Sequence, residues 1–321
     1  MLAIVFACLF LIFVHHKRKR EYTNPSRFHK KSDVPIPPTG VQVSRIDCPT
    51  PFDYGYLHPD EDNYQVRDPN ITALEPGLTR LWYEDVVSLS QCCKGGGIVL
   101  DIGSHFGYYA LLAASVGCKV IAAEPVPLFR SILNMNLNLN SRMPGKVEMV
   151  PYAIGLSSKE VRMFVPTTGI LGTARVTSDY IESSDIIVQQ KRIDTLLNEM
   201  GVKENICMLK ADVEGQEPDV ILSAKYILEK HKIYNIMLEF SPGYKKDGLN
   251  EMLSLLHSIG YCATVINWKW AKWPGRVNAV PIDKFIGAEY YSSLESENSR
   301  VSLINGVGFN TNLFLTLNCS R

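Results

Sequence analysis

Short apolar runs alternate with amphipathic stretches along residues 95–265. Apolar runs such as 98–100 and 120–123 are typical of strands buried on both faces of a parallel sheet. The stretches between them, such as 108–116 and 128–140, carry apolar residues at helical spacing. This strand–helix alternation predicts a doubly wound, mostly parallel α/β sheet.

The same pattern predicts the remaining elements of the core. We expect strands at 147–154, 206–212, 234–240, 261–266 and 313–317, and helices at 192–200, 220–230 and 249–259. Two further strands, at 161–165 and 186–190, flank a Gly/Thr/Ser-rich loop at 167–184 and break the simple alternation. We therefore expect a β insertion between core strands, placed as a lid or a substrate wall.

The first 40 residues differ in character from the rest. Residues 1–16 predict a hydrophobic membrane anchor, although a helix over the uncharged residues 1–14 would span only about 21 Å of a ~30 Å hydrocarbon core. A poorly formed signal peptide or an incomplete N-terminus is the alternative. Residues 17–40 predict a basic, Pro-rich linker, with seven Lys/Arg and one Glu within 17–31.

The side of the membrane stays open between the cytosolic face and the lumen of the ER or Golgi. Positive-inside counting over 17–31 favours the cytosol for the rest of the chain. The sequons Asn70-Ile-Thr72 and Asn318-Cys-Ser320 matter only in the secretory lumen. Between the linker and the core, residues 41–94 form an N-terminal extension, in which 81–89 predicts a helix.

Composition narrows the class of protein further. A chain of 321 residues with 46% hydrophobic residues can hold one large α/β domain with appendages or two small domains. Its net charge is zero, so the overall charge does not indicate a nucleic-acid partner. The eight cysteines form no C-x-x-C pair and no Cys/His cluster with zinc spacing, so we expect no metal. Cys118 and Cys207 are predicted as buried free thiols in core strands, which leaves the redox compartment undecided.

The candidate chemistry lies where the predicted strands end. After the first strand, Asp101-Ile-Gly103-Ser-His-Phe-Gly107 predicts a tight turn whose backbone N–H groups can approach a nucleotide-like ligand. The next strand ends at Glu124, whose carboxylate can accept hydrogen bonds from both hydroxyls of a ribose. Asp212 and Glu239 end two later strands, and ligands bind at such strand ends.

Five segments of the predicted core carry a recognisable pattern: Val99–Tyr109, Ala123–Pro125, Asn138–Asn140, Arg192–Asp194 and the Lys-x-Asp-x-Glu-Gly-x-Glu run within Leu209–Glu217. Together they resemble the FkbM family of S-adenosylmethionine-dependent methyltransferases, and the resemblance covers residues 95–265. It implies a Rossmann-like class I methyltransferase fold for a domain at 95–321, and S-adenosyl-L-methionine as the cofactor. The implied cofactor-binding residues are Asp101, Gly103, Ser104, Gly107, Glu124 and Pro125.

The resemblance also places Asp212 and Glu214 near the reaction centre. Because the sulfonium cofactor is already activated, the protein has to align an acceptor oxygen and remove its proton. Asp212, Glu214 and His105 are the candidate catalytic residues. Helix capping is the alternative role for the two acids, and a pocket wall is the alternative for His105, which departs from the Asn common in the family.

The function expected is O-methylation of a hydroxyl on a sugar, a glycan or a small metabolite. A nicotinamide-dependent oxidoreductase is an alternative, but Gly103 and Gly107 do not give the G-x-G-x-x-G spacing. A non-catalytic cofactor-binding protein of the same fold is another alternative. The aromatic segment Trp268–Trp273 predicts a sugar-stacking platform, a membrane contact or a cover for the sheet edge. The sequence does not indicate the oligomeric state.

Overall fold

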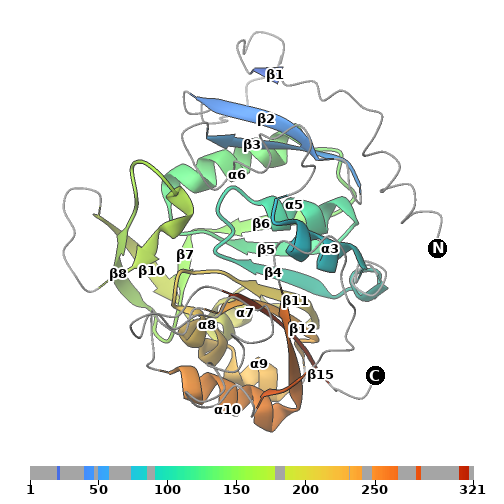
Figure 1. The fold of residues 1–321 in the computed structure, drawn as a ribbon, viewed down its shortest axis with the longest axis vertical. Coiled ribbons are helices and arrows are strands. Elements are labelled where there is room, and N and C mark those ends of the chain that lie inside the picture. Colours follow the sequence, from blue (N-terminus) through green and yellow to red (C-terminus); the bar gives the residue numbers. More distant parts are fainter. Residues whose placement is uncertain are drawn as a thin grey trace, which may run out of the picture.

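A central eight-stranded sheet organises the molecule, as the computed structural model shows (Figure 1). The structure describes residues 20–21, 40–46, 50–57, 74–84, 91–177, 185–230, 232–240, 248–266, 280–282 and 311–317. The expected anchor at 1–16, both sequons and Trp268–Trp273 lie outside these residues. Within the described part of the chain, no helix combines the length and apolar character needed to cross a bilayer.

The strand order of this sheet is β14-β13-β15-β12-β11-β4-β5-β6. The strands are β4 (Ile98–Ile102), β5 (Lys119–Ala123), β6 (Lys146–Val150), β11 (Ile206–Ala211), β12 (Asn235–Phe240), β13 (Tyr261–Ile266), β14 (Val280–Pro281) and β15 (Thr311–Leu317). The run from β6 through β12 is parallel, whereas β15 is antiparallel to both β12 and β13. The predicted mostly parallel sheet is therefore confirmed.

Helices cover both faces of the sheet because successive strand residues point to opposite sides. Val99 packs in the core beneath α5 (Tyr108–Ser115) and α6 (Pro127–Leu139). Its neighbours Ile98 and Leu100 pack in the core beneath α7 (Ile193–Glu199), α8 (Glu217–Ser223), α9 (Lys225–Glu229) and α10 (Leu249–Ile259). The single helix predicted at 220–230 is wrong, because the chain forms α8 and α9 with Ala224 between them.

A second, four-stranded sheet follows β6 and confirms the predicted β insertion. Its order is β7-β10-β8-β9, with β7 (Tyr152–Ile154), β8 (Lys159–Phe164), β9 (Arg175–Val176) and β10 (Asp185–Lys191). The prediction of one strand over 147–154 is wrong, since β6 and β7 belong to different sheets. Pro151 separates them, and a proline has no N–H with which to continue a hydrogen-bonded ladder.

The N-terminal extension contains a β-hairpin that the sequence pattern did not reveal. β2 (Val41–Ile46) pairs with β3 (Phe52–Leu57), and β1 (Arg20–Glu21) pairs with β2. Figure 1 places this small sheet beside α6. Asn136 of α6 joins the two parts: its side chain accepts from Gly55 N–H (2.7 Å) and donates to the carbonyls of Gly55 (3.0 Å) and Phe106 (2.8 Å).

The extension also contains α3 (Pro76–Glu84). The helix predicted at 81–89 therefore begins five residues earlier than expected, and residues 85–90 lie outside the described part of the chain. The proline at the first helical position has the φ angle that a helix needs and no N–H that would go unpaired. Leu78, Leu81 and Trp82 of α3 join the core beneath α5 and α6.

The prediction of free thiols at Cys118 and Cys207 is wrong. Cys92 is bonded to Cys207 and Cys93 to Cys118, with Cα–Cα distances of 5.8 and 4.9 Å. The partners are 115 and 25 residues apart in the chain, so local spacing could not reveal them. Gly97 makes room for the first bond, since a Cβ there would lie 2.5 Å from Sγ of Cys207.

Candidate functional site

The turn Gly103–Gly107 follows β4 and contacts the end of β5, the residue after β11 and helix α6. Gly103 has φ +75°, and its N–H donates to the carbonyl of Ala123 at the end of β5 (3.0 Å). A Cβ at Gly103 would lie 1.9 Å from the carbonyl oxygen of Asp212, and one at Gly107 would lie 2.1 Å from Leu133 of α6. Only glycine fits at either position, and the turn brings backbone N–H groups to the carboxyl edge of the sheet.

Backbone N–H groups of this turn and of the segment after Glu124 hold the Glu124 carboxylate in place. Its two carboxylate oxygens accept hydrogen bonds from the N–H groups of His105 and Val126, both at 2.8 Å. The side chain is buried, and this burial raises its pKa to about 7 although both hydrogen bonds act in the opposite direction. His105 adopts φ +51°, a conformation that costs energy in a non-glycine residue and that directs its N–H toward Glu124.

Asp101 and Ser104 hold buried polar atoms near this turn. Asp101 is 1% exposed and lies near the backbone N–H of Ala110, and the Ser104 hydroxyl has no hydrogen-bond partner among the described residues. Burial raises the pKa of Asp101 to about 6, while the nearby ammonium of Lys210 opposes the shift. Both residues therefore stand behind the turn as buried polar groups.

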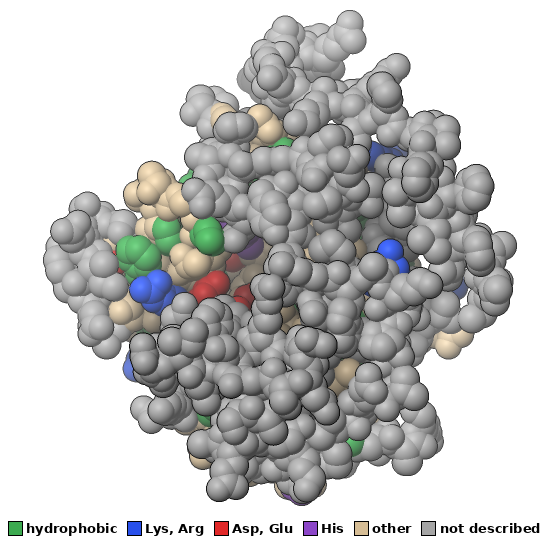
Figure 2. Space-filling model, in the orientation of Figure 1, with side chains coloured by type: hydrophobic (Ala, Val, Ile, Leu, Met, Phe, Trp, Pro, Cys, Tyr) green, Lys and Arg blue, Asp and Glu red, His purple; other side chains and the backbone are tan. Residues whose placement is uncertain are grey.

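A pocket with about 530 Å³ of empty space, including its solvent-filled mouth, opens at this edge of the sheet. Predicted site residues that line it are Gly103, His105, Glu124, Pro125 and Asp212, whereas Asp101, Ser104, Gly107 and Glu214 do not. Met163 and Val176 of the β insertion form part of its wall, as expected for a substrate wall. Figure 2 shows acidic and histidine side chains inside a hollow of this face.

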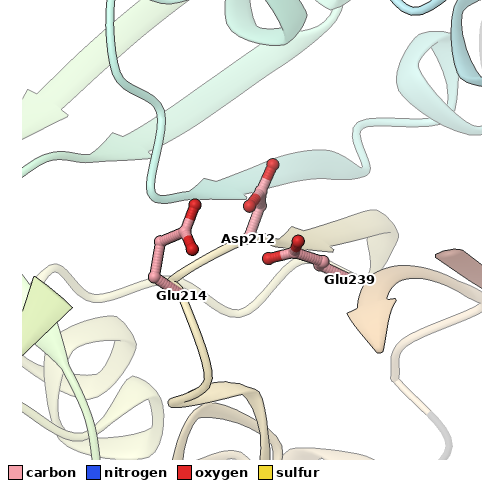
Figure 3. A group of neighbouring side chains, drawn as sticks. All are labelled: Asp212, Glu214 and Glu239. Atoms are coloured by element: carbon pink, nitrogen blue, oxygen red, sulfur yellow. The ribbon is translucent and has the colours of Figure 1, made fainter. Parts of the chain in front are cut away.

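Three acids converge at the ends of β11 and β12. Carboxylate oxygens of Asp212, Glu214 and Glu239 all lie within 4.8 Å of one another, and Figure 3 shows the three groups turned toward each other. Burial, together with the charge of Asp212, raises the pKa of Glu239 well above its ordinary value. Burial acts to raise the pKa of Asp212, but the charge and hydrogen bond of Lys210, together with a hydrogen bond to Glu239 and the influence of His105, outweigh burial and lower it. The pKa values of these two neighbouring carboxyls thus shift in opposite directions.

Glu217 stabilises the turn that precedes α8. The Glu217 carboxylate accepts hydrogen bonds from the N–H groups of Val213 (2.9 Å) and Gly215 (3.2 Å). The residue directly before α8 is Gln216, and its side chain makes no capping hydrogen bond. Asp212 therefore does not occupy the capping position of α8.

His105 is placed as a wall of the pocket. Its ring stacks on Phe106 with centroids 3.7 Å apart and meets the edge of Phe129 at 4.5 Å. Burial lowers the pKa of the imidazole to about 3, so the ring is neutral at physiological pH. Because the ring is held between two aromatic side chains, the structure favours the wall over the base.

The Methyltransferase FkbM domain matches residues 101–262, which is half of the chain. The chain belongs to the FkbM methyltransferase family. The matched region contains the glycine turn, Glu124 and the three converging acids, so the family assignment covers the site described above.

Three solved structures similar to the chain are distant from it in sequence. An FkbM methyltransferase from Methylobacillus flagellatus KT is 17% identical over 57% of this chain and 42% of its own, with a TM-score of 0.36. A SAM-dependent methyltransferase from Agrobacterium tumefaciens is 10% identical over 92% and 73%, with a TM-score of 0.39. A Pyrococcus abyssi tRNA (uracil-54, C5)-methyltransferase solved with S-adenosyl-L-homocysteine is 13% identical over 62% and 34%, with a TM-score of 0.32. The chain thus spans less than half of the first protein. No curated protein sequence matches it.

Three residues of this FkbM site were not predicted from the sequence. Lys210 donates to Asp212, the ring of Tyr109 faces Lys210, and Glu75 accepts from the Tyr109 hydroxyl. A charged residue within the apolar run 206–211 was a signal that could have indicated Lys210. Glu75 carried no such signal, because it lies in the N-terminal extension and reaches the site only through the fold.

Proposed function

We propose that this FkbM methyltransferase uses S-adenosylmethionine and transfers its methyl group to a hydroxyl of a sugar, a glycan or a small metabolite. The observation that carries the proposal is one pocket lined by two chemically distinct acids. Glu124 follows β5 and Asp212 follows β11, and the Gly103 turn after β4 lies between them. A nucleoside cofactor and an acceptor hydroxyl therefore have separate sets of protein groups to bind.

The residues present fit this cofactor. Glu124 keeps acceptor capacity on both oxygens for ribose hydroxyls, since each carboxylate oxygen has two lone pairs and takes one backbone hydrogen bond. Gly103 presents its backbone to the pocket, and Asp101 and Ser104 adjoin this turn without lining the pocket. When bound, S-adenosylmethionine supplies a methyl group on a positively charged sulfur, which excess carboxylates in the site attract.

Asp212 is the residue proposed to accept the acceptor's proton. It lines the pocket, follows β11 directly, and stays ionised beside Lys210. Burial and the charge of Asp212 raise the pKa of the neighbouring Glu239, which leaves Asp212 as the carboxyl that ionises more readily. An ionised carboxylate at this position can orient a hydroxyl and take its proton as the methyl group moves.

Calorimetry on the full chain tests the cofactor. We expect binding of S-adenosylhomocysteine and no binding of NAD, and Glu124→Ala should weaken S-adenosylhomocysteine affinity by more than about tenfold. Binding of NAD alone would favour the oxidoreductase alternative and reject the proposal. Transfer of labelled methyl groups onto cell extracts, fractionated into glycan, lipid and small-molecule pools, then identifies the acceptor class.

Disulfides support a proposal about the compartment. Cys92–Cys207 and Cys93–Cys118 link the end of the N-terminal extension to β11 and to the residue before β5, and such bonds persist in oxidising compartments. We infer that the domain faces the secretory lumen, with residues 1–16 as the proposed membrane anchor. Endoglycosidase treatment of the full-length protein from cells should increase its gel mobility through loss of glycans at Asn70 or Asn318. Unchanged mobility together with reduced cysteines would contradict the inference.

A further inference from the structure

Lys210 is a charged side chain in a strand that is otherwise apolar. All six residues of β11 are buried, and the Lys210 side chain is only 6% exposed. Burying an ammonium group is costly unless it is paired. Its nitrogen donates a hydrogen bond to Oδ2 of Asp212 at 2.9 Å, which satisfies part of that requirement.

Contacts on a second side keep the ammonium in place. Its nitrogen lies 4.9 Å from the ring centroid of Tyr109, within the range of a cation–π interaction. The Tyr109 hydroxyl donates to a carboxylate oxygen of Glu75 at 2.8 Å. Glu75 precedes α3 and has φ +42°, and it lies outside the region that matches the FkbM domain.

Three acidic side chains surround the single ammonium group of Lys210. The carboxylates of Asp212, Asp101 and Glu75 all attract this one ammonium and hold the pKa of Lys210 above its ordinary value, although burial acts in the opposite direction. A single positive charge cannot neutralise three negative ones. The carboxyl in direct contact, Asp212, has a lowered pKa, whereas burial raises the pKa values of Asp101 and Glu75.

We propose that Lys210 is a positioning residue for methyl transfer: it orients the Asp212 carboxylate toward the pocket and selects it as the ionised member of the acid cluster. Lys210 does not line the pocket, so it acts through Asp212 and does not touch the acceptor. The role in methyl transfer rests on the proposed function, whereas the electrostatic role of Lys210 is independent of it.

A carbon-13 titration of the Asp212 carboxyl in the full chain tests the electrostatic role, with Asp212→Asn to assign the signal. Asp212 is faced by Lys210, Glu239, Glu214 and His105. Loss of the ammonium in Lys210→Met should raise the midpoint of the Asp212 titration by about 1–3 pH units. Lys210→Arg keeps the charge and should leave the midpoint low. Lys225→Met, at a surface pair with Glu229, is the matched control and should change nothing.

An unchanged Asp212 midpoint in folded Lys210→Met would overturn the proposal. If that variant does not fold, the wild-type protein still decides, because a midpoint at or above the ordinary value of about 3.9 contradicts pairing with Lys210.

Labelled methyl transfer onto the extract pools tests the role in the reaction. Lys210→Met should lower transfer at least about tenfold while S-adenosylhomocysteine affinity changes less than about threefold, and Lys210→Arg should restore part of the activity. Full activity in Lys210→Met would refute the positioning role. Absence of transfer by the wild-type chain onto any pool would reject the proposed function instead, and the titration would still report on Lys210.

Discussion

The pKa of Glu124 makes cofactor affinity depend on pH in a direction that can be worked out. Burial raises this pKa to about 7, so protonation near neutral pH changes how the carboxyl can bind ribose. Two ribose hydroxyls need two acceptor oxygens, and only the ionised form offers acceptor lone pairs on both without a competing proton. Affinity for S-adenosylhomocysteine should therefore rise as the pH increases through 7.

The size of the effect follows from the ionised fraction. A group with a pKa of about 7 is roughly 9% ionised at pH 6 and roughly 91% ionised at pH 8. If the neutral form does not bind ribose, affinity rises about tenfold between these pH values, equivalent to about 1.4 kcal/mol. Asp101, with a pKa of about 6, is about half ionised at pH 6 and adds at most about a factor of two.

Isothermal titration calorimetry with S-adenosylhomocysteine at pH 6, 7 and 8 measures this dependence. Glu124→Gln is the matched control: it cannot ionise, so only the roughly twofold contribution of Asp101 should be left. Titration of the ligand itself is the same for both proteins and cancels in the comparison. Equal affinity at pH 6 and 8, or the same tenfold rise in Glu124→Gln, would refute the assignment of Glu124 to the ribose.

Three further predictions concern packing. Gly103→Ala should abolish S-adenosylhomocysteine binding in calorimetry, because the new Cβ would lie 1.9 Å from the Asp212 carbonyl oxygen. Gly96→Ala is the control and should retain binding: Gly96 also has a left-handed φ, but no atom lies within 4 Å of the Cβ position. Replacing Cys92 and Cys207 by serine should lower the free energy of unfolding in urea by about 4.8 kcal/mol, because the lost bond closes a loop of 115 residues in the unfolded chain. Replacing Cys93 and Cys118 opens a loop of only 25 residues and should lower it by about 3.5 kcal/mol. Equal losses would contradict this entropic account. Asn136→Ala leaves three buried backbone groups unpaired and should lower unfolding free energy by at least about 2 kcal/mol, whereas exposed Asn138→Ala should change it by less than about 0.5 kcal/mol.

The sequence predicted seven of the eight strands of the central sheet because each of these is a local apolar signal, whereas the two-residue strand β14 (Val280–Pro281) was not predicted. Runs such as 98–102 and 206–211 are apolar on both faces, which identifies a buried parallel strand without knowledge of its neighbours. The prediction was wrong where a local run crosses between sheets. Residues 147–154 form one apolar pattern, but Pro151 divides it between two sheets, and the pattern alone does not report hydrogen-bond partners.

Candidate site residues at strand ends were also accessible from the sequence. Gly103, Glu124 and Asp212 follow three parallel strands, and parallel topology places their carboxyl ends at one edge, where the pocket lies. The side chains that adjust these residues were not accessible. Glu75 meets Tyr109 across 34 positions, and its contact depends on how the N-terminal extension packs on the sheet.

The tertiary structure also decided which cysteines form disulfides and which carboxyls have raised or lowered pKa values, because these properties depend on groups that are remote in the chain. Cys118 and Cys207 have the local pattern of buried thiols, yet the folded chain brings Cys93 and Cys92 to them. Asp212 and Glu239 are both strand-end acids, but only Asp212 meets the ammonium of Lys210 and has a lowered pKa. The sequence determined which residue types lie at the edge of the sheet, because the hydrophobic pattern of a strand and the residue at which the strand ends are local properties of the chain. Bonding and protonation depend on distances between segments remote in the chain, and only the tertiary structure decides those.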